Sequence, residues 1–308
     1  MHDSSASTFT FYSDGFDIVV DSTLPKGSPK AALVVAHGMA EHAARYGRFA
    51  GELAAHGYAV YAPDHRGHGR TAGGDDRLGW AGGDGWNGML RDLDRLTTLV
   101  EERHPGTPLV LFGHSMGSVL AQRFAQLHGA RLAGLILSGT FGDAPNIKAG
   151  IAAASVLRTL RGERAPSPLQ RTMFAGFNKG FTPQRTGFEW LSRDDAEVQK
   201  YAGDPRCGFT FSNGLLTDML RGYAETWKPA NERRIPVALP VLFFSGALDP
   251  VGGNTRAVTA LAQRYRALGL RDVHVTFYPD ARHEMLNETN RDEVVRDVLA
   301  WLDAHVHL

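Results

Sequence analysis

A serine between small residues is the first place in this chain where chemistry could be centred. Ser115 lies in the pentapeptide GHSMG at 113–117, directly after the apolar run 109–112. Apolar residues then recur at helical steps, at 119, 120, 124 and 127. A Gly-x-Ser-x-Gly sequence between a strand and a helix is typical of a nucleophile elbow, a strained turn that exposes the serine hydroxyl. The flanking strand and helix count against a chance match, so we predict that Ser115 is a nucleophile.

A serine hydroxyl is a weak nucleophile unless a base removes its proton and an acid orients that base. Around an elbow of this type, the acid and the histidine follow the serine in chain order, each after a later strand. Asp249 follows the predicted strand 241–245, and His283 follows the predicted strand 273–277. Either residue alone could be an ordinary loop aspartate or a surface histidine. Together with Ser115 they predict a triad for acyl transfer.

Two backbone amides are expected to stabilise the oxyanion that forms in such a reaction. One is the amide of Met116, which follows the nucleophile, and the other comes from the loop after the predicted strand 31–36. We assign the second donor to Met39, since Gly38 before it lets the backbone approach closely. For His37, a structural hydrogen bond is favoured over a role for its side chain.

The elements that must position these residues form a regular alternation. Apolar strands are predicted at 31–36, 58–62, 109–112, 132–137, 241–245 and 273–277, and amphipathic helices at 46–57, 86–100, 255–268 and 292–304, besides the helix that follows Ser115. A hairpin with its turn at 13–15 precedes them, over 8–24. This order predicts an α/β fold with a mostly parallel central sheet and helices on both faces.

The alternation stops between residues 141 and 240. Four helical segments are predicted there instead of strands, at 147–160, 169–177, 189–201 and 215–227. We therefore predict a core made of 1–140 and 241–308, with 141–240 inserted as a helical cap. A separate domain is disfavoured because the core strands resume after the insertion.

The composition limits the partners of the chain. Its 308 residues include 33 Lys and Arg and 33 Asp and Glu, so the formal net charge is zero and gives no reason to expect nucleic acid. The single cysteine, Cys207, excludes an internal disulfide and fits a reducing compartment. The N-terminal residues show no export signal, and no apolar run reaches the roughly 18 residues of a membrane span. We expect a cytoplasmic protein and leave its oligomeric state open.

Metal and cofactor sites are not indicated. The pairs His37 with His42 and His65 with His68 are not accompanied by the pattern of carboxylate or cysteine ligands that a zinc site uses. After His283, Asn287 stands where a His-Glu-x-x-His motif needs its second histidine. The glycines between 67 and 85 match neither a dinucleotide nor a phosphate loop. We therefore expect a reaction without metal or cofactor.

Several longer stretches resemble a known family. They are HGMAEHAARYGRFAGELAAHGYAVYAPDHRGHGRT, GHSMGS, LSRDDAEVQKYAGDPRCGF, SGALDPVGGN and YPDARHEMLNETNRDEV. With these the chain resembles the α/β-hydrolase superfamily, in its monoacylglycerol lipase and lysophospholipase-like branch. The resemblance implies Ser115 as nucleophile, Asp249 as acid and His283 as base. It also implies a helical cap and the hydrolysis of esters with one long acyl chain.

The cap is predicted to help to bind that chain. Ile147, Ile151, Ala154, Leu157 and Leu160 recur at helical spacing. Such a face either covers the core or lines an acyl tunnel. On the second interpretation, Ile151 and Leu157 bind substrate together with Gly38 and His114. The rim of the cap would then also touch a lipid surface transiently.

Other functions are compatible with the same motifs. Monoacylglycerols are the favoured substrates, but a lysophospholipase or a general carboxylesterase would carry the same motifs. More remote alternatives are a peptidase of the proline-aminopeptidase type, which would need an acidic site for a free amine, and a binding protein without catalysis on the same scaffold.

Overall fold

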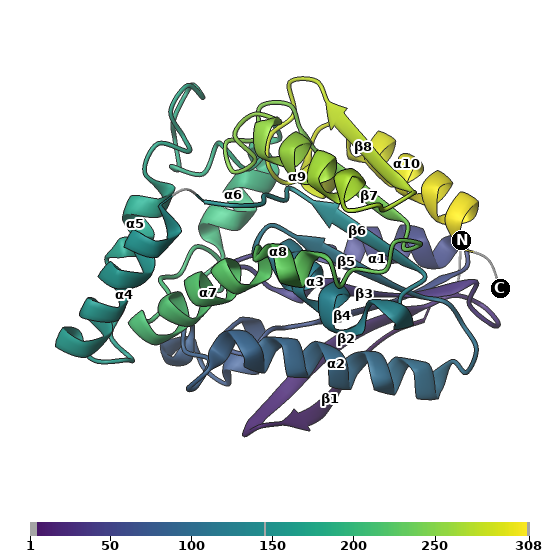
Figure 1. Ribbon diagram of the computed structural model, residues 1–308, viewed down its shortest axis with the longest axis horizontal. Helices are drawn as coiled ribbons and strands as arrows, with labels where there is room; N and C mark the ends of the chain where they lie inside the picture. Colours follow the sequence, from purple (N-terminus) through teal and green to yellow (C-terminus); the bar gives the residue numbers. More distant parts are fainter. Residues whose placement is uncertain (1–4, 145, 307–308) are drawn as a thin grey trace.

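The sheet at the centre of the molecule has eight strands in the order β1-β2-β4-β3-β5-β6-β7-β8 (Figure 1). The computed structural model describes residues 5–144 and 146–306. Residues 1–4, part of the segment in which no export signal was predicted, lie outside this description, as do 145, within the predicted cap, and 307–308. The strands are β1 (Ser5–Ser13), β2 (Phe16–Leu24), β3 (Ala31–Ala36), β4 (Tyr58–Pro63), β5 (Leu109–His114), β6 (Gly134–Ser138), β7 (Val241–Gly246) and β8 (Val273–Tyr278).

Strands β4, β3, β5, β6, β7 and β8 run parallel to one another, whereas β1 and β2 form an antiparallel hairpin whose β2 pairs antiparallel with β4. Every residue of β3, β4, β5, β6 and β7 is buried, because helices cover both faces of this part of the sheet. The predicted α/β fold with a mostly parallel sheet is confirmed. Parallel strands end at the same edge, so the residues that follow β3, β5, β7 and β8 meet there.

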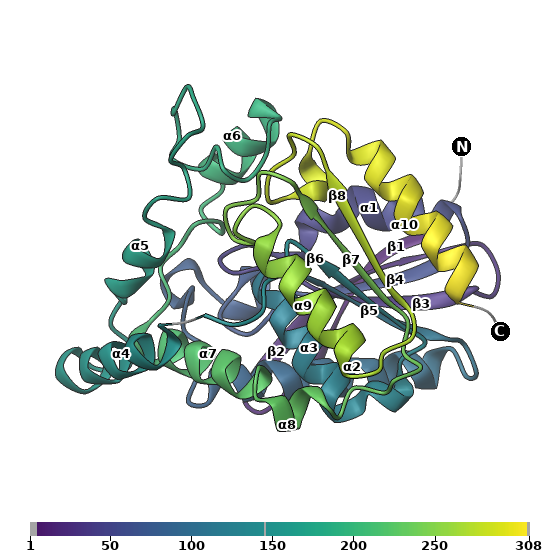
Figure 2. The same ribbon diagram turned by 45° about the horizontal axis from the view of Figure 1, so that its top comes forward.

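Helices pack in layers on the two faces (Figure 2). They are α1 (Gly47–Ala55), α2 (Gly85–Arg103), α3 (Met116–His128), α4 (Ile147–Arg161), α5 (Leu169–Phe174), α6 (Asp195–Gly203), α7 (Asn213–Thr226), α8 (Pro229–Glu232), α9 (Arg256–Ala267) and α10 (Arg291–His305). Short 3-10 helices are η1 (Ala43–Tyr46), η2 (Gly69–Ala72), η3 (Asp75–Arg77), η4 (Gly129–Arg131) and η5 (Met285–Asn287). Apolar residues of α1 and α10 share one core with the sheet, and those of α2, α3, α7 and α9 share the other.

The chain leaves the sheet after β6 and returns at β7, and the segment between contains α4 to α8. Figure 1 shows α4 and α5 at the end of the molecule opposite the two termini. Helix α7 is integrated more closely than the prediction of a cap suggested, since it packs on α2 and α3 and contributes Leu215, Leu216 and Met219 to the core. Helix α4 lies along α7.

Two details of this segment differ from the sequence prediction. The helix expected over 189–201 begins only at Asp195, because the Asp194 side chain caps it by accepting the N–H groups of Ala196 and Glu197. Glu189 instead accepts the backbone N–H groups of the loop 185–187. Leu160, expected on the apolar face of its helix, is 77% exposed.

Within residues 5–144 and 146–306, no helix is both long enough and apolar enough to cross a bilayer.

Candidate active site

The turn between β5 and α3 places Ser115 at the carboxyl edge of the sheet. Its backbone is strained, with φ 52° and ψ −119°, and its N–H donates to the carbonyl oxygen of Ser138 on β6 at 3.0 Å. The turn needs a glycine at 117, because a Cβ there would overlap the backbone carbonyl of Ala36 at the end of β3. The sequence thus forms the strained elbow predicted from GHSMG.

His283 and Asp249 meet in the interior of the same edge. The Nδ1 atom of His283 lies 2.9 Å from Oδ2 of Asp249, and the two residues are only 2% and 0% exposed. Asp249 is held in place by two further donors, the Ser245 hydroxyl at 3.0 Å and the Val251 N–H at 2.9 Å. This geometry orients the imidazole and fixes a proton on Nδ1, which leaves Nε2 as the basic nitrogen.

The electrostatics of this pair agree with such a role. Burial alone would lower the pKa of His283, but the charge of Asp249 and the hydrogen bond to it outweigh burial and raise that pKa above its ordinary value. Burial would likewise raise the pKa of Asp249, yet the pKa is lowered, chiefly because of His283. The pair therefore stabilises an imidazolium.

Ser115 and His283 line one narrow cleft of about 110 Å³, together with Gly38, Met39 and His114. The segment between β6 and β7 forms part of the wall of this cleft through Trp190. The Trp190 ring lies 5.2 Å from the His283 ring, and the Trp190 carbonyl oxygen accepts the backbone N–H of His283 at 3.3 Å. The structure thus brings together the serine, the histidine and the predicted oxyanion loop.

The oxyanion loop is held by a buried carboxylate that the sequence analysis did not single out. Oε1 of Glu41 accepts the Gly38 N–H at 2.5 Å and the Tyr46 hydroxyl at 2.9 Å. A Cβ at position 38 would lie 2.7 Å from this oxygen, so the glycine is required for the contact. Because the Gly38 amide is bound to Glu41, the amide of Met39 is the better candidate for an oxyanion donor.

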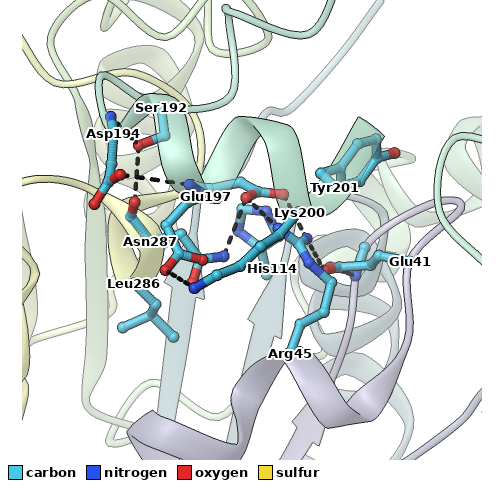
Figure 3. A network of polar contacts seen from close by, with 12 residues as sticks. Glu41, Arg45, His114, Ser192, Asp194, Glu197, Lys200, Tyr201, Leu286 and Asn287 are labelled. Carbon is cyan, nitrogen blue, oxygen red and sulfur yellow. Dashed lines mark hydrogen bonds and ion pairs between the residues drawn. The ribbon is translucent and has the colours of Figure 1, made fainter. Parts of the chain in front are cut away.

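Arg45 links the oxyanion loop to the loop that carries His283. Figure 3 shows the Arg45 side chain beside that of Glu41. Its guanidinium binds Glu41 at 2.6 Å and both carboxylate oxygens of Glu284 at 2.6 and 2.5 Å. Burial would raise the pKa of Glu41, but Arg45 and nearby donors lower it to about 2. The spacing of Glu41 and Arg45, four residues apart in the sequence, is the only signal that could have suggested part of this network.

The neighbouring histidines His37 and His114 have hydrogen-bond partners within the protein, and burial lowers the pKa of each. Nδ1 of His37 lies 2.8 Å from the Gly38 carbonyl, and Nε2 accepts the His65 N–H at 3.0 Å. Nδ1 of His114 lies 3.2 Å from the Ser138 hydroxyl. Burial, with a further contribution from His283, lowers the pKa of His114 to about 4, so this ring presents a neutral surface to the cleft.

A larger, apolar cavity of about 550 Å³ also reaches Ser115. Besides Ser115 its walls are formed mostly by apolar side chains of α4, α5 and α7 and of the loops around them, among them Met39, Phe141, Ile147, Leu169, Met173, Phe174, Phe177, Trp190, Met219, Leu220 and Tyr223. Ile151 and Leu157, predicted to bind substrate, are not among them. Helix α4 instead offers Ile147, Ala149 and Gly150, because its Ala154 is buried and Ile151 packs against the core.

Side chains that could hold a metal gather away from the predicted triad. In the part of the chain that the structure describes, two groups of three such residues occur: His42, Asp204 and Cys207, and Asp272, His274 and His305. The pair His65 and His68, considered from the sequence, belongs to neither group.

The comparison with known proteins fits this fold and site. The family model described as serine aminopeptidase, S33, matches residues 27–290. The chain belongs to this family. It is 29% identical over 296 residues to the monoacylglycerol lipase of Mycolicibacterium smegmatis, with 95% of each chain covered. It is 26% identical over 288 residues to the monoglyceride lipase of Mus musculus, covering 92% of this chain and 85% of the relative.

A solved structure is also closely similar. The carboxyl esterase of Bacillus coagulans, crystallised in complex with glycerol, superposes with a TM-score of 0.91 at 28% identity, over 98% of this chain and 99% of the other. The α/β-hydrolase resemblance found in the sequence is therefore confirmed.

Proposed function

We propose that the protein is a serine esterase that cleaves monoacylglycerols, with Ser115, His283 and Asp249 as its catalytic triad. One observation carries the proposal: Ser115 lines both an apolar cavity of about 550 Å³ and a narrow cleft whose walls combine aromatic side chains with polar groups such as Gln170 and His114. An ester with one long acyl chain and a small hydroxylated alcohol fits these two spaces on either side of its carbonyl. The names of the relatives support the same substrate class.

In the proposed reaction, Nε2 of His283 takes the proton of the Ser115 hydroxyl as Oγ attacks the ester carbonyl carbon. The N–H groups of Met39 and Met116 stabilise the oxyanion of the tetrahedral intermediate. His283 then donates the proton to the leaving glycerol oxygen, and the C–O bond breaks.

Hydrolysis of the acyl-enzyme repeats these steps with water. His283 takes a proton from the water molecule, and the resulting attack releases the fatty acid and returns the proton to Ser115. Asp249 holds the imidazole and stabilises its charged form throughout.

We also propose that the segment 141–240 serves as the cap that encloses the acyl chain. Its helices α4, α5 and α7 supply most of the apolar wall described above. A cavity of this kind favours long chains, since each buried methylene contributes about 0.8 kcal/mol.

The state of the carboxylates at the narrow cleft argues against an aminopeptidase. Such an enzyme needs a free carboxylate for the amino group of its substrate. Glu41 and Glu284 line the cleft, but all their oxygens already accept hydrogen bonds from Gly38, Arg45, Tyr46 and Asn287.

The test is a comparison of kcat/KM over a substrate panel. We expect kcat/KM to be higher for monoacylglycerols with long acyl chains than for diacylglycerols, lysophosphatidylcholine or prolyl-naphthylamide. A preference for lysophosphatidylcholine would assign a lysophospholipase instead, and a preference for prolyl-naphthylamide would assign an aminopeptidase.

The rim of the cap supports a transient contact with lipid surfaces. On α4, Val156 and Leu160 are 55% and 77% exposed. We expect the protein to sediment with phosphatidylcholine vesicles and the Val156→Ser/Leu160→Ser variant to do so several-fold less. Equal sedimentation of the two proteins would contradict this contact.

A further inference from the structure

Three residues with metal-binding side chains meet where the oxyanion loop contacts the cap. His42 lies directly after Glu41, and Asp204 and Cys207 lie in the turn that follows α6. Their ligand atoms all lie within 4.8 Å of one another, and Nε2 of His42 is 2.9 Å from Oδ2 of Asp204. His42 was not predicted to be a metal ligand, since Asp204 and Cys207 lie far from it in the sequence, but the fold brings both to it.

We propose that His42, Asp204 and Cys207 form a binding site for a thiophilic divalent cation of the Zn²⁺ type. An imidazole, a carboxylate and a thiolate are the three side-chain types that Zn²⁺ uses in proteins. Metal–ligand bonds of about 2.0 to 2.3 Å in a tetrahedron place ligand atoms roughly 3.3 to 3.7 Å apart. The cluster reaches such spacings with shifts of about an ångström or less in its side chains.

The backbone around the cluster is already fixed. The Cys207 N–H donates to the Asp204 carbonyl at 2.9 Å, and the Gly208 N–H donates to the Ala40 carbonyl at 2.9 Å. The Tyr201 hydroxyl donates to the same Ala40 carbonyl at 3.1 Å. The turn 204–208 and the loop before His42 are therefore joined without any metal, so the ligands need little reorganisation.

The site is also open to a cation and to a fourth ligand. Side chains of His42 and Asp204 are 14% and 34% exposed. All three ligands line a cleft of about 880 Å³ that is open to solvent, so a water molecule can complete the coordination shell. Oδ1 of Asp204 accepts the Arg206 N–H at 2.8 Å, which orients the carboxylate toward His42.

Binding is coupled to a proton. A cysteine thiol must lose its proton to become a metal ligand. When a metal–sulfur bond forms, that proton passes to solvent and the sulfur becomes a thiolate. The neutral imidazole and the two anions then balance the charge of the cation.

Such a cation would join the cap to the oxyanion loop. His42 belongs to the loop that carries Met39, whereas the other two ligands belong to the segment between β6 and β7. Because only the folded protein brings these ligands together, binding raises the thermal midpoint.

The single cysteine of the chain makes the test direct. Titration of the apoprotein with Cd²⁺ produces an ultraviolet sulfur-to-metal charge-transfer band, and any such band must come from Cys207. We expect one equivalent of Cd²⁺ to saturate the band. Zn²⁺ should displace the bound Cd²⁺, which removes the band, and should raise the thermal unfolding midpoint of the apoprotein. His274→Asn, in the second cluster, serves as the matched control and leaves the band unchanged.

Variants of the ligands decide the outcome, after circular dichroism has verified that they fold. Cys207→Ser abolishes the band, and His42→Asn and Asp204→Asn each weaken Cd²⁺ binding at least tenfold. A wild-type protein without the band overturns the proposal. So does an undiminished affinity in His42→Asn, since Cys207 would then bind the cation alone. None of these readouts depends on catalysis, so the proposal stands or fails separately from the proposed function.

Discussion

A leucine in place of Gly150 would shorten the acyl cavity from the α4 side. Gly150 lines the cavity, and a Cβ there would lie 3.7 Å from Cδ1 of Leu220, an ordinary van der Waals distance. The leucine side chain would occupy the space of about three methylene groups of the acyl chain. Burial of each methylene contributes about 0.8 kcal/mol to substrate binding. The loss of about 2.4 kcal/mol corresponds to a roughly 60-fold lower kcat/KM for long-chain esters.

The same change is expected to stabilise the fold. Leucine is favoured over glycine within a helix by up to about 1 kcal/mol, so the denaturation midpoint of Gly150→Leu should not fall. Gly51→Leu is the matched control, because Gly51 lies in α1 with nothing within 4 Å of its Cβ position. The assay compares kcat/KM on dodecanoyl and butyryl esters of p-nitrophenol. A folded Gly150→Leu enzyme with an unchanged ratio would refute the placement of the acyl chain.

Three further outcomes follow from the structure. Asp249 raises the pKa of His283, and His283 must be neutral to act as the base. As the pH is lowered, kcat/KM should therefore fall with a midpoint above about 6.5, the ordinary pKa of histidine. Asp249→Asn should move that midpoint of the pH–rate profile downward while it lowers the rate, and an unmoved midpoint would contradict the pairing. Glu41→Gln should lower kcat/KM about 10- to 100-fold on short and long esters alike, as expected when a hydrogen bond to a charged group is weakened; a loss confined to long chains would assign Glu41 to acyl binding.

The sequence predicted the fold because the periodicity of its apolar residues is a local signal. Segments such as 31–36 and 241–244 are continuous apolar runs, and the structure buries each of their residues. Chain order and strand ends then sufficed to place Ser115, Asp249 and His283 at one edge of the sheet. Their catalytic roles stay a prediction, as do the division into core and cap and the cytoplasmic location.

What the sequence could not predict depends on contacts between distant residues. Arg45 and Glu284 are 239 positions apart, and no periodicity connects them. Asp204 and Cys207 reach His42 only because α6 is folded over the oxyanion loop. The two roles left open for the apolar face of α4 depend on the same kind of contact: Ile147 lines the cavity and Ala154 is buried in the core, whereas Leu160 is 77% exposed, and the position of α7 decides between these surroundings.

Covalent labelling of Ser115 tests the central claim most directly. Treatment with a fluorophosphonate should abolish esterase activity and add one adduct, mapped by mass spectrometry to the peptide that contains Ser115. The Ser115→Ala variant should fold, take up no label and lose several orders of magnitude in kcat. An adduct on another residue that accompanies the loss of activity, or a Ser115→Ala variant that keeps a tenth of the wild-type turnover, would contradict the account.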